Sequence, residues 1–220
     1  MGWGEFIVAF GVFFLSHSVP VRPSVRAHLV DRLGQRGFTL AYSVLSLAVL
    51  GWVIAAAGRA PFVPVWGWAT WQPHVTLTLM LAVCLILGLA IGRPNPFSFG
   101  GARNHLFDPE RPGLVRITRH PMLLALALWA FGHMIPNGDL AHVILFGSFA
   151  GFAVLGRVLI DRRKRREMGA EWLRLDKAVR AQGPSPARPL VAVLRLTLGV
   201  ALFMLLLGAH PYVFGVAPLG

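Results

Sequence analysis

The chain has 220 residues, of which 55% are hydrophobic and only 14% are charged, and its formal net charge is +12. Its mean hydropathy is +0.63, and the charged fraction is well below the ~25% of average soluble domains, so the composition excludes an ordinary soluble globular protein. It favours an all-α, polytopic membrane protein in which residues 1–220 form a single domain.

Six mostly apolar runs follow one another along the chain. We expect each run to cross a hydrocarbon core about 30 Å thick, which takes about 20 helical residues at about 1.5 Å of rise per residue. The runs are residues 3–20, 38–57, 75–92, 121–136, 140–160 and 189–208. We therefore expect a six-transmembrane-helix bundle, in which the fourth span is the shortest.

The first span is expected to remain in the protein. A cleaved secretory signal starts with a basic segment, whereas the first Lys or Arg here is Arg22, and an acid, Glu5, lies near the start. The link between the second and third spans is rich in tryptophan, which is typical of an interfacial aromatic belt. These tryptophans are Trp66, Trp68 and Trp71.

Three later segments connect the remaining spans. "GRPNPFSFGG" at 92–101 is rich in glycine and proline and predicts a loop. Pro-Asn-Gly at 136–138 predicts a tight turn, so the fourth and fifth spans should form an antiparallel hairpin. Residues 161–182 carry apolar residues at helical spacing among charges, which predicts an amphipathic helix on the cytoplasmic surface. These apolar residues are Trp172, Leu175 and Val179.

The basic residues alternate between rich and poor segments. Lys and Arg number four in 21–37, one in 58–74, five in 93–120, none in 137–139 and nine in 161–188. The positive-inside rule places the rich segments in the cytoplasm, so we expect both termini in the periplasm of a bacterium and the chain in its inner membrane. The charge therefore reflects topology and contact with anionic lipid heads of the bilayer, and does not indicate nucleic acid.

Ionisable residues within or beside the spans are the candidate functional residues, because a bilayer disfavours them. His17 lies in the first span and His133 near the outer end of the fourth. Neutral imidazole is a common ligand of haem iron, which makes both candidate metal ligands. Arg116, Arg119 and His120 open the fourth span. Guanidinium groups pair with carboxylates, so the two arginines suit haem propionates, and they suit equally the role of positive-inside anchors, whereas His120 is an alternate iron ligand.

Other chemistries lack their residues. No HExxH pattern or paired carboxylates occur, and none of the nine acids lies in mid-span, which argues against zinc hydrolysis. The single cysteine, Cys84, excludes a disulfide or CxxC pair within the chain and is interpreted as a small core residue.

Several blocks together resemble the NnrU family of bacterial membrane proteins and the related zeta-carotene isomerase of plants and cyanobacteria. The blocks are "GLVRITRHP" at 113–121, "LWAFGHMIPNGD" at 128–139, "SHS" at 16–18, "DRR" at 161–163, a Gly-aromatic pattern at 169–172 and "HP" at 210–211. The resemblance covers nearly the whole chain and is strongest at 113–138.

The resemblance implies a cofactor and two possible roles. The resemblance to the isomerase implies a haem b enzyme that isomerises a carotenoid double bond. The histidines that ligate the haem in the isomerase fall on His17 and His133 of this chain. Where the isomerase has a cysteine three residues before the second ligand, this chain has Ala130. The NnrU side is associated with denitrification and implies an accessory protein of nitrite and nitric oxide reduction. A hydrophobic small molecule such as a carotenoid is the partner that the isomerase side implies.

The order of residues leaves the ligand pair open. His120 and His133 are about 20 Å apart along one helix. Predicted depth in the membrane pairs His17 with His120, whereas the resemblance pairs it with His133. Either His133 or His120 can therefore be the second iron ligand beside His17, and His133 is the first choice.

Two alternative functions remain. "RHP" followed by a basic amphipathic segment also resembles isoprenylcysteine and phospholipid methyltransferases, which bind S-adenosylmethionine. Their motif continues as RHP-x-Tyr, whereas this chain has Leu123, and their paired acids are replaced here by "RRKRRE", which ends at Glu167. The other alternative is a non-catalytic membrane scaffold without a cofactor.

Overall fold

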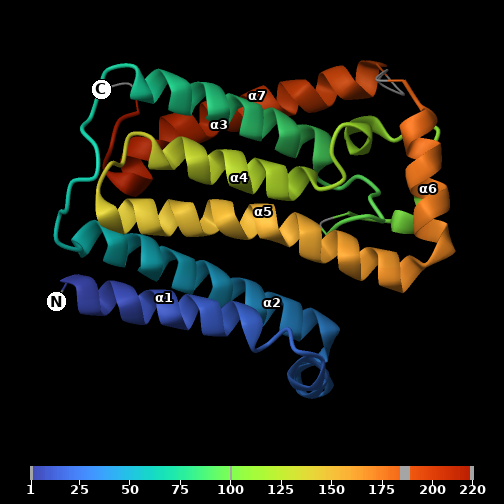
Figure 1. The fold of residues 1–220 in the computed structure, drawn as a ribbon, viewed down its shortest axis with the longest axis horizontal. Coiled ribbons are helices and arrows are strands. Elements are labelled where there is room, and N and C mark those ends of the chain that lie inside the picture. Colours follow the sequence, from blue (N-terminus) through green and yellow to red (C-terminus); the bar gives the residue numbers. More distant parts are fainter. Residues whose placement is uncertain (1, 100, 184–188, 219–220) are drawn as a thin grey trace. The chain divides into compact units, whose positions relative to one another are not determined.

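The computed structural model describes residues 2–99, 101–183 and 189–218, and helices are the regular elements of this part of the chain. The long helices are α1 (Gly2–Ser18), α2 (Pro23–Arg59), α3 (Gln72–Ala90), α4 (Pro121–Met134), α5 (Leu140–Met168), α6 (Ala170–Ala181) and α7 (Pro189–Phe214), and the short 3-10 helices are η1 (Asn104–Leu106) and η2 (Gly113–Arg116) (Figure 1). The predicted all-α class is confirmed.

Among the residues that the structure describes, four helices are long and apolar enough to cross a membrane: α2, α3, α5 and α7. This makes the chain a multi-pass membrane protein. The other two predicted spans also coincide with helices, but α1 has 17 residues and α4 has 14. At about 1.5 Å per residue these two are shorter than a hydrocarbon core of about 30 Å, so a count of six spans stays a prediction.

The chain folds as two compact units. The first contains residues 1–67 and 138–145, and the second contains 68–137 and 146–220. Helix α5 starts in the first unit and continues into the second.

In the first unit, α1 and α2 form an antiparallel hairpin. Glu5 near the start of α1 forms an ion pair with Arg59 at the end of α2, and Trp52 Nε1 donates to the same carboxylate at 3.3 Å. Residues 21–37, expected to be a loop, are instead mostly helical: α2 starts at Pro23 and is interrupted at Gly34, whose φ of 70° is accessible to glycine. Proline at the first helical position explains this early start.

In the second unit, α3 is antiparallel to both α4 and α7. Thr76 at the start of α3 donates to the carbonyl of Gly132 at the end of α4 at 2.9 Å. At the other end of α3, Arg195 of α7 donates to the carbonyls of Gly88 and Ile91, both at 3.0 Å. Arg195 therefore caps carbonyls at the end of α3 that the helix itself leaves unpaired.

The contact between α3 and α7 depends on two glycines. A Cβ on Gly88 would lie 2.5 Å from the carbonyl oxygen of Arg195, and one on Gly199 would lie 2.8 Å from that of Cys84. Real Cβ atoms do not approach backbone oxygens so closely, so the two helices can touch only because both positions lack a side chain. Small residues at such contacts are common between membrane helices.

The predicted turn at 136–138 joins α4 to α5, and the two helices pack as an antiparallel hairpin. The ring of Trp129 lies 5.5 Å from that of Phe146 and 6.0 Å from that of Phe149. The chain reverses between Met134 and Leu140, in agreement with the turn signal.

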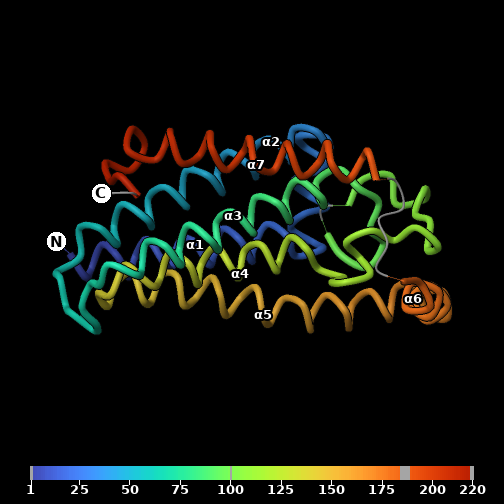
Figure 2. Tube along the Cα trace, turned by 90° about the horizontal axis from the view of Figure 1, so that it is seen from above, coloured from blue at the N-terminus to red at the C-terminus, as the bar shows by residue number. Residues whose placement is uncertain are grey.

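The amphipathic helix exists but faces protein. Residues 161–168 continue α5, the chain bends at Gly169 with φ 56°, and α6 follows. The predicted apolar face is buried against Phe97 and Val115, so its apolar side does not lie on lipid. This face consists of Trp172, Leu175 and Val179. Figure 2 shows α6 nearly end-on while α5 and α7 run across the view.

The glycine contact predicts an asymmetric response to alanine. Gly199→Ala should lower the free energy of unfolding by about 1–3 kcal/mol, because the added methyl group is forced against α3. The measurement is the thermal midpoint in detergent. Gly208→Ala on the same helix is the control, since a Cβ there meets nothing within 4 Å. Equal midpoints for the two variants would contradict the close contact.

Candidate functional site

Arg119 forms the centre of a charged cluster in the second unit. Its Nη2 lies 2.7 Å from Asp161 Oδ2 and its Nε lies 3.3 Å from Oδ1 of the same carboxylate, and its Nη1 lies 3.0 Å from Asp176 Oδ1. Burial lowers the pKa of Arg119, but the two carboxylates outweigh this and raise it above its ordinary value. The Arg119 cation thus connects the segment before α4 to both α5 and α6.

His120 is the most buried member of the cluster, with 2% of its surface exposed. Its Nε2 lies 2.9 Å from Asp161 Oδ1 and its Nδ1 lies 3.0 Å from Ser98 Oγ. Because an ionised carboxylate only accepts, Nε2 carries a hydrogen, and in a neutral imidazole Nδ1 then accepts from the Ser98 hydroxyl. Both ring nitrogens of His120 are therefore occupied.

Burial keeps this imidazole neutral. It lowers the pKa of His120 below its ordinary value, and the nearby Arg119 and Arg157 act in the same direction, against the opposing effect of Asp161. The arrangement Ser98, His120 and Asp161 contains the groups of a proton relay, but it serves here to hold a loop and two helices together.

The loop after α3 is held by amide hydrogen bonds. Asn95 Nδ2 donates to the carbonyl of Arg119 at 2.9 Å, and Asn95 Oδ1 accepts from the backbone N–H of Phe97 at 3.1 Å. The backbone N–H of Asn95 donates to Asn104 Oδ1 at 2.9 Å. These contacts explain how a glycine- and proline-rich loop reaches a fixed shape and positions Ser98 beside His120.

Trp172 closes the cluster from the α6 side. The guanidinium of Arg119 lies 5.3 Å from the centre of its ring and that of Arg165 lies 4.2 Å away. At these distances a cation is attracted by the negative face of the indole. The tryptophan therefore links the charged cluster to the apolar contact beneath α6.

Arg119 and His120 both contact Asp161, whereas Arg116 lies outside this cluster. Arg116 Nε donates to the carbonyl of Gln182, at the end of α6, at 2.7 Å. Since Arg119 is already bound by two carboxylates, its predicted role toward haem propionates stays a prediction, and that role would require one of these pairs to open. Sequence reasoning missed the acids Asp161 and Asp176. Asp161 could have been found from its position, because it is an acid that directly follows the fifth apolar run and precedes a series of arginines.

His133 lies near the other end of α4, in an aromatic setting. Its Nδ1 donates to the carbonyl of Trp129, four residues earlier, at 2.9 Å. The Trp129 ring lies 4.9 Å from the imidazole and the Phe146 ring 5.5 Å from it. Asn137 Nδ2 donates to the carbonyl of His133 at 2.7 Å, which holds the end of the helix.

His17 has the same local geometry in the first unit. Its Nδ1 donates to the carbonyl of Phe13, again four residues earlier, at 2.8 Å, and Ser16 Oγ lies 3.2 Å from the same nitrogen. Phe13 stacks on the imidazole at 4.1 Å, and the Tyr42 ring stands edge-on at 6.1 Å.

The donor chemistry of both histidines fits a haem ligand. A carbonyl that accepts from Nδ1 fixes the tautomer and leaves the Nε2 lone pair for a metal, which is the usual arrangement of metal-binding histidines. His74 makes the same contact with the carbonyl of Thr70, so a histidine outside the predicted pair shares this geometry. In the described part of the chain, no group of three or more His, Cys, Asp or Glu side chains could hold a metal ion. A haem needs fewer protein ligands, since the porphyrin supplies four nitrogens.

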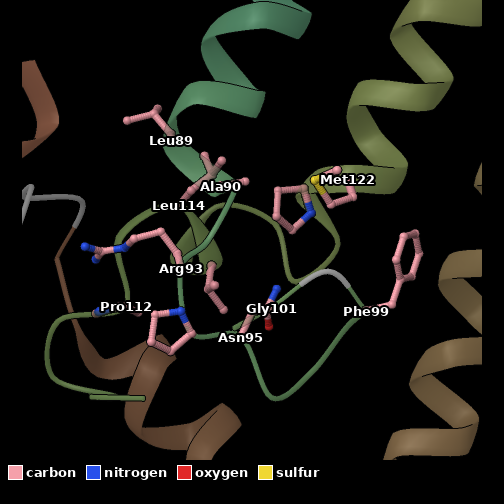
Figure 3. Close-up of a pocket in the computed structure, with 12 residues that line it drawn as sticks. Leu89, Ala90, Arg93, Asn95, Phe99, Gly101, Pro112, Leu114 and Met122 are labelled. Carbon is pink, nitrogen blue, oxygen red and sulfur yellow. The ribbon is translucent and has the colours of Figure 1, made fainter. Parts of the chain in front are cut away.

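A small cavity of about 20 Å³ lies beside the charged cluster, between the end of α3, the following loop, η2 and the start of α4 (Figure 3). Its lining includes Ala90, Asn95 and Met122. Such a volume holds a water molecule, whereas pockets for small-molecule ligands usually measure about 300–1,000 Å³. This cavity is therefore too small for S-adenosylmethionine.

These features define a multi-pass α-helical membrane protein with a charged cluster at one end of its second unit and histidines within its apolar helices. The model of the family described as NnrU protein matches residues 5–218. The chain belongs to the NnrU family. Comparisons with curated proteins and with solved structures found no match.

The charged cluster predicts a large cost for removing its shared acid. Asp161→Asn should lower the free energy of unfolding by about 1.5–3 kcal/mol, because it weakens hydrogen bonds from both Arg119 and His120. Glu167→Gln is the matched control, because the pairs of Glu167 with Arg163 and Lys164 are exposed to solvent and their loss should change the free energy of unfolding far less. Chemical denaturation in detergent would measure both, and a control as damaging as Asp161→Asn would refute the role of the cluster.

The neutral state of His120 predicts a pH dependence. Its pKa is lowered in the folded chain, so the unfolded chain binds the proton more readily. This contribution to stability is complete above the ordinary value of about 6.5 and is lost as the pH falls below it. The thermal midpoint of the wild type should therefore fall more steeply between about pH 7.5 and 5.5 than that of His120→Asn. Parallel curves would show that His120 does not titrate in this way.

Proposed function

We propose that this chain is a haem b-binding membrane protein in which His17 and His133 are the iron ligands. The observation that carries the proposal is that Nδ1 of each imidazole donates to a carbonyl of its own helix, while Nε2 has no hydrogen-bond partner among the described residues. The resemblance of the chain to the zeta-carotene isomerase supplies the same pair. His120 is the weaker candidate, because Ser98 and Asp161 engage both of its nitrogens.

The aromatic surroundings also suit a porphyrin. Phe13 and Tyr42 flank His17, and Trp129 and Phe146 flank His133. Flat apolar side chains of this kind pack well against a macrocycle and exclude water from the iron. When bound, the haem would supply one-electron chemistry, and these side chains would set its polarity and access.

Of the two roles implied by the resemblance, an accessory role in nitrite and nitric oxide reduction is the better supported. Ala130 occupies the place of the isomerase's cysteine and is fully buried. The single cysteine, Cys84, lies on α3 at the contact with α7. The resemblance implies that the isomerase uses its own cysteine in a redox-dependent change of ligand. This chain has no thiol beside His133 on α4, so carotenoid isomerisation is not the function that we propose.

The proposal predicts which histidines control haem content. His17→Ala and His133→Ala should each weaken haem binding by more than the ~10–100-fold typical of changes outside the ligand set, because each removes an iron ligand. Haem content would be measured by pyridine haemochrome assay after purification in detergent, together with oxidised and reduced spectra. His74→Ala is the control, because His74 shares the local geometry but is not a proposed ligand.

Two results would overturn the assignment. Full haem content in the folded double variant would exclude His17 and His133 as ligands. A wild-type protein that shows no Soret band after reconstitution with haem and removal of the excess would exclude haem binding and leave the methyltransferase and scaffold alternatives.

A further inference from the structure

One face of α5 changes from apolar to basic without a break. Leu155 and Leu159 are each 62% exposed, and Arg162 and Arg166 are also exposed. The spacing of four, three and four residues places all four side chains on the same side of the helix. An exposed apolar stripe therefore leads directly to two guanidinium groups.

These two arginines differ from their basic neighbours. Arg163 and Lys164 both pair with Glu167, at 2.6 and 3.0 Å, and Arg165 lies over the ring of Trp172. Within the described residues, Arg162 and Arg166 form no ion pair with a carboxylate. The carboxylates on this part of α5 and on α6 are thus used by other cations, and a positive charge remains on one face.

We propose that Arg162 and Arg166 bind the phosphate of an anionic phospholipid whose acyl chain lies along Leu155 and Leu159. Guanidinium groups match phosphate oxygens with paired hydrogen bonds. Arg162 comes two residues after the last apolar residue of the span, Ile160, so its guanidinium lies at the level of lipid headgroups. The charge is complementary to such a lipid, and the apolar stripe accommodates its chain.

The inference does not depend on haem binding. It uses only the outer face of α5, whereas the proposed ligands lie on α1 and α4. A failure of either proposal therefore leaves the other intact.

The test compares two variants of equal charge. Arg162→Gln/Arg166→Gln removes the proposed phosphate ligands, and Arg163→Gln/Arg174→Gln removes two arginines that already pair with Glu167 and Glu171. Native mass spectrometry of the detergent-purified full chain would count bound dioleoyl phosphatidylglycerol and dioleoyl phosphatidylcholine at equal concentrations. The wild type and Arg163→Gln/Arg174→Gln should bind phosphatidylglycerol about 10- to 30-fold better than phosphatidylcholine. Arg162→Gln/Arg166→Gln should lose this preference.

Three outcomes would overturn the inference. A preference that persists in Arg162→Gln/Arg166→Gln would exclude these residues as the phosphate ligands. An equal loss in both variants would show that total charge attracts the lipid, with no defined site. Equal binding of a short-chain phosphatidylglycerol would show an anion site to which the apolar stripe contributes nothing.

Discussion

The polar end of the second unit depends on the pairing of one arginine with two aspartates. Arg119 precedes α4, Asp161 lies where α5 leaves its apolar stretch and Asp176 lies on α6, so a single cation ties three elements together. Near a membrane boundary an unpaired carboxylate is costly, because it is partly removed from water. The same carboxylate of Asp161 accepts from His120, which brings the loop before α4 into the arrangement. The pair of Arg119 with Asp176 holds α6 in the position where Trp172 and the rest of its apolar face pack against Phe97 and Val115.

This pairing also separates the histidines into two kinds. Both ring nitrogens of His120 form hydrogen bonds, with Ser98 and Asp161, so its role is structural. The Nδ1 atoms of His17 and His133 each donate to a carbonyl four residues earlier, and within the described residues neither Nε2 atom forms a hydrogen bond. A histidine beside arginines resembles a cofactor site in sequence, but here it belongs to the protein's own electrostatics. The proposed iron ligands are instead those with apolar and aromatic neighbours.

The helices could be predicted from the sequence because hydrophobic length and proline or glycine punctuation are local signals. The apolar face of α6 was predicted for the same reason, since Trp172, Leu175 and Val179 repeat at helical spacing. Their contact with Phe97 and Val115 could not be predicted, because it depends on the path of an irregular loop. The partners of Arg119 were hidden by distance along the chain, and the helical start of α2 was hidden by four arginines that suggested a loop.

The bonds from Arg195 to α3 have a consequence for the order of assembly. Arg195 lies on α7, the last helix of the chain, and its guanidinium satisfies carbonyls of Gly88 and Ile91 at the end of α3. During synthesis α3 emerges roughly a hundred residues before its capping group, so its end must remain hydrated at the membrane surface until then. Completion of α3 is thus linked to translation of the C-terminal helix. A chain truncated before α7 would lack both this cap and the glycine contact, and would present an unfinished helix end to the bilayer.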